Sequence, residues 1–157
     1  MEVKQKECIL QTFGYQFRLF FREVHYQENL VGLIACLSLN APYGEHSFYT
    51  QAEAVPLSDI GSFINYLEDH INLLRINPST KSPLFSTYRL NFQVQALEGD
   101  VSSDIGFSIR CVVNLKKPGM NLLPNYLGIE SSVPLSHIRE FIDSLTEALE
   151  SFTRTQD

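Results

Sequence analysis

A chain of 157 residues is long enough for one domain with a single hydrophobic core. Hydrophobic residues make up 44% of the chain and charged residues 19%, proportions that exclude the disordered and coiled-coil classes. The formal net charge of -6 argues against binding to a nucleic-acid backbone, because neutralising phosphates requires clustered Lys and Arg.

The first predicted element is a half-buried strand near the N-terminus. Apolar side chains occupy every second position from Phe13 to Phe21, with Gly, Gln and Arg between them, and Phe20 alone breaks the alternation. Further strands are predicted at residues 31–39 and 46–55, and the loop between them contains Asn, Pro and Gly, which are typical of turns. The first half of the chain is therefore expected to be rich in strands.

An amphipathic helix is predicted after the third strand, in the segment VPLSDIGSFINYLEDHINLL at residues 55–74. Its apolar residues recur at spacings of three and four, which places them on one helical face: Ile60, Phe63, Ile64, Leu67, Ile71 and Leu74. Pro56 cannot donate to a strand ladder, and Ser58 is predicted to cap the helix through its hydroxyl. The run Glu68, Asp69 and His70 is interpreted as the solvated face of this helix, not as a metal site.

A polar connector at residues 75–83, too short for an interdomain tether, leads into a second set of the same elements. Strands are predicted at residues 88–96, 105–115 and 126–133 from the same period of two. The closing segment VPLSHIREFIDSLTEALESF, residues 133–152, is predicted to form a second amphipathic helix with Ser136 as its cap.

The two helical segments share eight identical residues over twenty positions without a gap, which indicates an internal duplication. Repeat 1 spans about 9–75 and repeat 2 about 84–153, and each has the order βββα within a single domain of residues 1–157. One helix cannot cover three strands alone. The predicted fold is therefore α+β, with a mostly antiparallel sheet of about six strands and both amphipathic helices packed on it. A continuous sheet and two packed layers both fit this pattern.

The residues that usually carry chemistry form no recognisable site. Cys8, Cys36 and Cys111 are widely separated and form no C-x-x-C pair, so we expect buried, reduced thiols and neither a disulfide framework nor a zinc site. The His residues lack metal-ligand spacing, the glycines form no phosphate-binding loop, and no catalytic motif is present. We assign no catalytic, cofactor-binding or metal-binding residue and expect a protein that is not an enzyme.

Three carboxylates in a predicted loop are the candidates for contact with a protein partner. Glu98, Asp100 and Asp104 lie in the run EGDVSSD, which lacks the spacing and the closing Glu of an EF-hand calcium loop. Turn chemistry also accounts for the Gly, Asp and Ser of this run. Further features specific to this chain are expected where the two repeats differ, in the Tyr43–Glu45 turn and the Pro118–Asn125 loop.

The layout of the chain resembles that of the WapI-like immunity proteins of bacterial polymorphic toxin systems. The resemblance covers most of the chain: a small acidic protein, a first helix of the VPLSDIGSFINYLEDHINLL kind after strands, a strand ending near LEGD, and a closing IESSVPLSHIREFIDSLTEAL helix. It implies a cytoplasmic inhibitor that binds and blocks one cognate toxin, and it carries over no site residues. An acidic chain would attract a basic toxin domain electrostatically.

Two alternatives to this interpretation stay open. An acidic secretion-chaperone-like protein is one, although such proteins usually open with a helix and this chain opens with a strand. An enzyme with an unrecognised site is the other.

Residues 1–8 carry four charges with no apolar segment behind them, and no window approaches about 18 uninterrupted apolar residues, so we expect a cytoplasmic protein without a membrane span.

Overall fold

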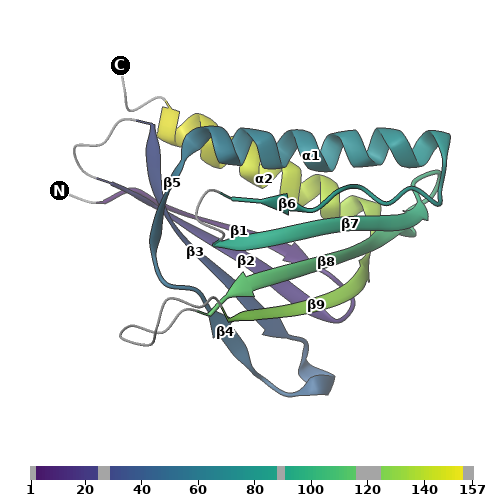
Figure 1. Cartoon of the computed structure of the whole chain (residues 1–157), viewed down its shortest axis with the longest axis horizontal. Helices are drawn as coiled ribbons and strands as arrows, with labels where there is room; N and C mark the ends of the chain where they lie inside the picture. The colour runs from purple at the N-terminus through teal and green to yellow at the C-terminus, as the bar shows by residue number, and fades with distance from the viewer. Residues whose placement is uncertain (1–2, 25–28, 88–90, 116–124, 154–157) are drawn as a thin grey trace.

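The computed structural model describes residues 3–24, 29–87, 91–115 and 125–153, which form two antiparallel sheets and two long helices (Figure 1). Sheet A contains β1 (Gln5–Gln11), β2 (Tyr15–Glu23), β3 (Leu30–Leu39), β4 (Ser47–Tyr49) and β5 (Glu53–Pro56). Sheet B contains β6 (Phe85–Ser86), β7 (Phe92–Asp100), β8 (Gly106–Asn114) and β9 (Tyr126–Val133). The helices are α1 (Leu57–Ile76) and α2 (Leu135–Thr153), and a short 3-10 helix, η1 (Ala41–Tyr43), precedes β4.

Each sheet is an antiparallel meander that leads into a helix. The strand order is β1-β2-β3-β4 in sheet A, where β5 also pairs with β3, and β6-β7-β8-β9 in sheet B. The predicted α+β class and its two helices are confirmed. The expected total of about six strands, three in each half, is wrong, because the two sheets have five and four strands and pack as separate layers.

The additional strands have local causes. In β1, exposed Lys6 and Glu7 obscure the alternation, which is visible only at buried Cys8 and Leu10. The expected strand at residues 46–55 is divided into β4 and β5 at Thr50. There the Thr50 N–H donates to the Ala35 carbonyl and the Thr50 hydroxyl accepts from the Ala35 N–H, both at 2.9 Å, so a side chain replaces a backbone carbonyl in the ladder.

The helices are exchanged between the two halves. α1 packs against β7 of sheet B, whereas α2 packs against β1 of sheet A, and the two helices also contact each other along one side of the crossing sheets (Figure 1). Aromatic rings from both halves meet where these elements converge: Phe17 lies 5.2 Å from Phe92, and Phe63 lies 5.3 Å from Phe92 and 6.0 Å from Phe141, measured between ring centroids. The two halves therefore share one apolar core.

A buried polar link joins the two sheets at one end of this core. The Asn91 amide nitrogen donates to the carbonyls of Leu33 (3.5 Å) and Gln51 (3.3 Å), and its amide oxygen accepts from the Thr50 hydroxyl at 3.2 Å. The Tyr15 hydroxyl on β2 donates to the Ile109 carbonyl on β8 at 2.8 Å. These bonds satisfy polar groups that would otherwise be costly to bury between the sheets.

The predicted serine caps are wrong, because each helix begins one residue before its serine. α1 begins at Leu57 directly after Pro56, and no side chain bonds to its first turn as a cap. α2 likewise begins one residue before Ser136, so Ser136 donates instead of accepting: its N–H and hydroxyl both reach the Asp104 carboxylate, at 2.7 and 3.0 Å. A carboxylate from the loop between β7 and β8 therefore caps α2 and favours its N-terminal dipole.

Candidate functional site

The outer face of sheet A, which points away from sheet B and the helices, carries large apolar side chains. The odd-numbered residues of β2, from Tyr15 to Phe21, are buried in the core. Since successive side chains of a strand point to opposite faces, Arg18 and Phe20 point outward. The residue that broke the alternation in the sequence, Phe20, therefore places an aromatic ring on the side of β2 that is otherwise polar.

Neighbouring strands extend this ring into a patch. The register places Phe20 between Glu7 of β1 and Ile34 of β3. The Tyr49 ring of β4 lies 6.4 Å from the Phe20 ring and is 53% exposed, and Ile9 of β1 is 42% exposed. We call Ile9, Phe20, Ile34 and Tyr49 the outer patch. These residues come from four different strands, so the fold of sheet A is required to assemble the patch.

A hollow of about 820 Å³ lies over Phe20, Ile34 and Tyr49 of the outer patch and over the adjoining end of the sheet. Apolar residues and charged residues share its lining: Gln5, Lys6, Glu7, Arg18, Phe20, Phe21, Arg22, Glu23, Val24, Gly32, Leu33, Ile34, Tyr49 and Ala52. The volume is within the range of roughly 300–1,000 Å³ that is usual for sites that hold a ligand or an anchoring side chain.

An ion pair between Arg18 and Glu7 lies beside the outer patch and fixes the position of the Arg18 guanidinium. The Arg18 guanidinium donates to Glu7 Oε1 through Nε (2.9 Å) and Nη2 (2.6 Å), and it lies 5.0 Å from the centroid of the Phe20 ring. The hydrogen bonds to Glu7 raise the pKa of Arg18. The pair cancels its own charge, which leaves Lys6, Arg22 and Glu23 as the other charged groups of the lining.

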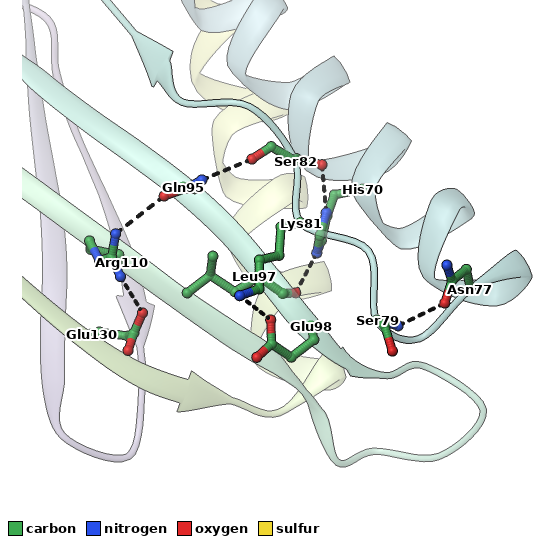
Figure 2. Close-up of polar contacts among 10 residues, drawn as sticks. All are labelled: His70, Asn77, Ser79, Lys81, Ser82, Gln95, Leu97, Glu98, Arg110 and Glu130. Atoms are coloured by element: carbon green, nitrogen blue, oxygen red, sulfur yellow. Dashed lines mark hydrogen bonds and ion pairs between the residues drawn. The ribbon is translucent and has the colours of Figure 1, made fainter.

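The corresponding outer face of sheet B is polar at its centre. Arg110 of β8 donates to Gln95 of β7 at 3.2 Å and to Glu130 of β9 at 2.9 Å, and Gln95 in turn donates to the Ser82 carbonyl at 3.2 Å (Figure 2). Ser108 and Ser132 pair beside them. Equivalent surfaces in the two halves therefore differ: one is aromatic and hollow, and the other is a hydrogen-bonded polar lattice.

The three predicted contact residues have separate intramolecular partners. Glu98 is exposed and lies 3.6 Å from the Lys81 ammonium (Figure 2). Asp100 accepts from the N–H and hydroxyl of Ser102, which lowers the pKa of its carboxyl. Asp104 caps α2. Their contact with a partner protein stays a prediction. Residues 118–124 of the predicted Pro118–Asn125 loop lie outside the described part of the chain.

His70 is buried, and its predicted place on the solvated face of α1 is wrong. Its Nδ1 lies 2.7 Å from the Ser82 hydroxyl and its Nε2 lies 2.7 Å from the Leu97 carbonyl (Figure 2). Its ring also packs edge-on against Phe107. Burial lowers the pKa of this imidazole, and the bond to Leu97 opposes that effect. The histidine fastens α1 to β7 and to the connector, and it does not line the hollow.

The cysteines are buried free thiols, as predicted. Burial raises the pKa of Cys111 to about 12, and a hydrogen bond with Tyr15 opposes the increase. Burial also raises the pKa of the Tyr15 hydroxyl. Cys111, Tyr15 and His70 are all enclosed in the core. The groups with shifted pKa values therefore do not come together at an accessible surface.

Within the part of the chain that the structure describes, no group of three or more His, Cys, Asp or Glu side chains is arranged to hold a metal ion. Neither described helix is long and apolar enough to cross a membrane. Comparison with known protein families and with curated proteins finds no match for this chain.

Proposed function

We propose that this protein is a non-enzymatic binding module that holds a partner protein against the outer face of sheet A. The observation that carries the proposal is the outer patch with its charged surroundings. Protein interfaces typically have an apolar centre and a polar rim, with Tyr and Arg over-represented among the residues that contribute most to affinity. The polar lattice of sheet B serves as an internal comparison, because the same fold does not require an apolar outer face.

The partner in this proposal is a basic toxin domain that the module neutralises. The net charge of -6 would attract a basic protein over a distance and increase the rate of association. The resemblance to WapI-like immunity proteins supplies the class of partner. A toxin that docks with an apolar anchor in the hollow would contact the aromatic rings of Phe20 and Tyr49.

An acidic stripe on α2 adds support for a basic partner. Its four carboxylates are exposed and recur at spacings of three and four along one helical face: Glu140, Asp143, Glu147 and Glu150. α2 packs against β1, the strand that also contributes Lys6 and Glu7 to the hollow. Burial raises the pKa of the Cys8 thiol on β1, and the nearby charge of Glu147 adds to this increase. The stripe and the hollow therefore lie on opposite sides of the same strand, and the stripe attracts a basic partner from a distance.

The test is co-expression with the C-terminal domain of the toxin that is expected to be encoded next to this protein. The unmodified chain should form a complex with that domain and restore growth. Tyr49→Asp places a charge in the outer patch and should weaken binding by at least about 30-fold, which corresponds to about 2 kcal/mol. Circular dichroism checks that the variant is folded.

Tyr43→Asp is the matched control. Tyr43 is 66% exposed on η1, away from the residues that line the hollow, so this substitution should leave affinity within about twofold. Binding that survives Tyr49→Asp but is lost in Tyr43→Asp would move the interface to the η1 turn and refute the assignment to sheet A. Failure to bind or to protect against the toxin would refute the immunity function itself.

A further inference from the structure

Among the sheet edges that the described residues form, β9 is the longest without cover. α2 packs against β1. The free side of β7 is bonded to the connector, where the Ser82 N–H donates to the Ala96 carbonyl and the Gly99 N–H to the Pro78 carbonyl, at 3.0 and 3.1 Å. The remaining edge of sheet A consists of β4 and β5, three and four residues long. β9 has eight residues and lies at the margin of sheet B (Figure 1).

The backbone groups that point away from β8 can be identified from one hydrogen bond. The Ser132 carbonyl accepts from the Phe13 N–H at 3.0 Å, so Ser132 directs its backbone groups to the free side. Because these directions alternate along a strand, Tyr126, Gly128 and Glu130 direct their N–H and carbonyl groups to the same side. Between the described residues there is no backbone hydrogen bond to these three on that side.

The usual protections of an edge strand are missing from β9. Natural proteins block long edges with Pro, with unpaired charges or with bulges. The segment YLGIESSV contains neither Pro nor Lys, and its pairing with β8 is regular over all eight residues. Its single charge, Glu130, is already neutralised by Arg110 at 2.9 Å. An edge of this kind is a template for another strand.

We infer that β9 pairs with β9 of a second copy of the chain, antiparallel and centred on Gly128. In this register Gly128 faces Gly128 without side chains between them, Tyr126 faces Glu130, and Leu127 faces Ile129 on the other side of the sheet. A register centred on Glu130 would place two carboxylates opposite each other, which is unfavourable. Phe13 occupies the Ser132 carbonyl and so ends the paired stretch before Ser132.

This pairing would join two copies of sheet B into one continuous sheet. The contact lies on sheet B, whereas the hollow lies on the outer face of sheet A, so the inference does not depend on the proposed function. Two copies that each carry a charge of -6 repel one another at long range, and the test therefore belongs at physiological ionic strength, where such repulsion is screened beyond about 8 Å.

Gly128→Cys tests the register directly. The native cysteines are 1%, 0% and 0% exposed, so the new thiol is the accessible one. Facing residues of an antiparallel pair are about 5.5 Å apart between Cα atoms, which is within disulfide range. With oxidised glutathione as the oxidant, Gly128→Cys should form covalent dimers at least about tenfold faster than Ser132→Cys, whose position lies outside the paired stretch. Non-reducing electrophoresis measures both rates.

Two further measurements complete the test. Light scattering across the micromolar range should give the unmodified chain twice its monomer mass of 17.9 kDa. Glu130→Pro removes an N–H from the free side and leaves the bonds to β8 in place, so it should return the mass to that of the monomer in a folded protein. Gly128→Ala controls for the added Cβ, which would lie 2.9 Å from Val112 Cγ2 and force a small local shift. Equal cross-linking rates, or a monomer mass for the unmodified chain, would overturn the inference.

Discussion

Acidification is expected to weaken the folded state through His70. The ring is 0% exposed, and each nitrogen lies 2.7 Å from an oxygen. The Leu97 carbonyl can only accept, so Nε2 carries the proton, and Nδ1 accepts from the Ser82 hydroxyl. The imidazole is neutral in this arrangement. Protonation of Nδ1 would put a charge in the core and force the hydroxyl to turn round.

The sign of the stability change with pH, and an upper limit on its size, follow from the direction of the His70 pKa shift. Burial lowers the pKa of His70 below its usual value of 6.5, whereas the unfolded chain takes up the proton near that value. The unfolded state therefore binds more protons as the pH falls from 6.5 toward the pKa of the folded state. Stability falls through this window by at most about 1.4 kcal/mol per pH unit, and above it His70 adds no slope.

Urea unfolding followed by far-ultraviolet circular dichroism at several pH values measures this slope. His70→Gln is the comparison, because its amide N–H can still donate to Leu97 but the side chain does not titrate. Every other titratable group is present in both proteins, so the difference between the two slopes isolates His70. Identical slopes, or an unmodified protein that becomes more stable as the pH falls below 6.5, would refute the reasoning.

Two further predictions concern backbone geometry and capping. Gly106 has a φ of 75°, and a Cβ there would lie 1.9 Å from the Val133 carbonyl oxygen, so Gly106→Ala should lower the unfolding free energy by more than about 3 kcal/mol or prevent folding. Gly44→Ala, at φ 90° in an exposed turn, should lower it by only about 1 kcal/mol. Equal shifts of the melting temperature in the two variants would contradict this prediction. Asp104→Ala should destabilise α2 by about 1 kcal/mol, because it removes the carboxylate that caps the helix. Ser136→Ala should destabilise it by less, because the backbone N–H of residue 136 keeps its bond to Asp104. The reverse ranking in urea unfolding would restore Ser136 as the cap.

The sequence was most informative where a hydrophobic period covered a long segment. The spacing of three and four from Ile60 to Leu74 predicted α1, and the same spacing predicted α2, because each helix buries one continuous stripe. β2 and β8 were predicted for the same reason, since each buries alternate residues. The division at Thr50 had no such signal, because it depends on a hydroxyl that takes the place of a carbonyl in the ladder.

Candidate site residues were harder to predict because they come together only in the folded sheet. Ile9, Phe20, Ile34 and Tyr49 belong to four strands, and their contact depends on register. A signal was present in Phe20, the apolar residue at a position that alternation assigns to the outside. His70 was misassigned because it was grouped with its exposed neighbours Glu68 and Asp69, although it lies three residues after Leu67 and four before Leu74, on the apolar stripe of α1. Bonds to Ser82 and Leu97, which the sequence does not reveal, satisfy its two ring nitrogens in the core.

The exchange of helices constrains the order in which the chain can fold during synthesis. Sheet A is complete once β5 has been made, but the helix that packs against β1 follows β9, the last of the described strands. α1 emerges early, yet the strand against which it packs, β7, is made after it. When only the first half of the chain has been synthesised, sheet A and α1 therefore both expose apolar faces. The last steps of folding must therefore wait until α2 has been made, unlike those of a protein whose halves close independently.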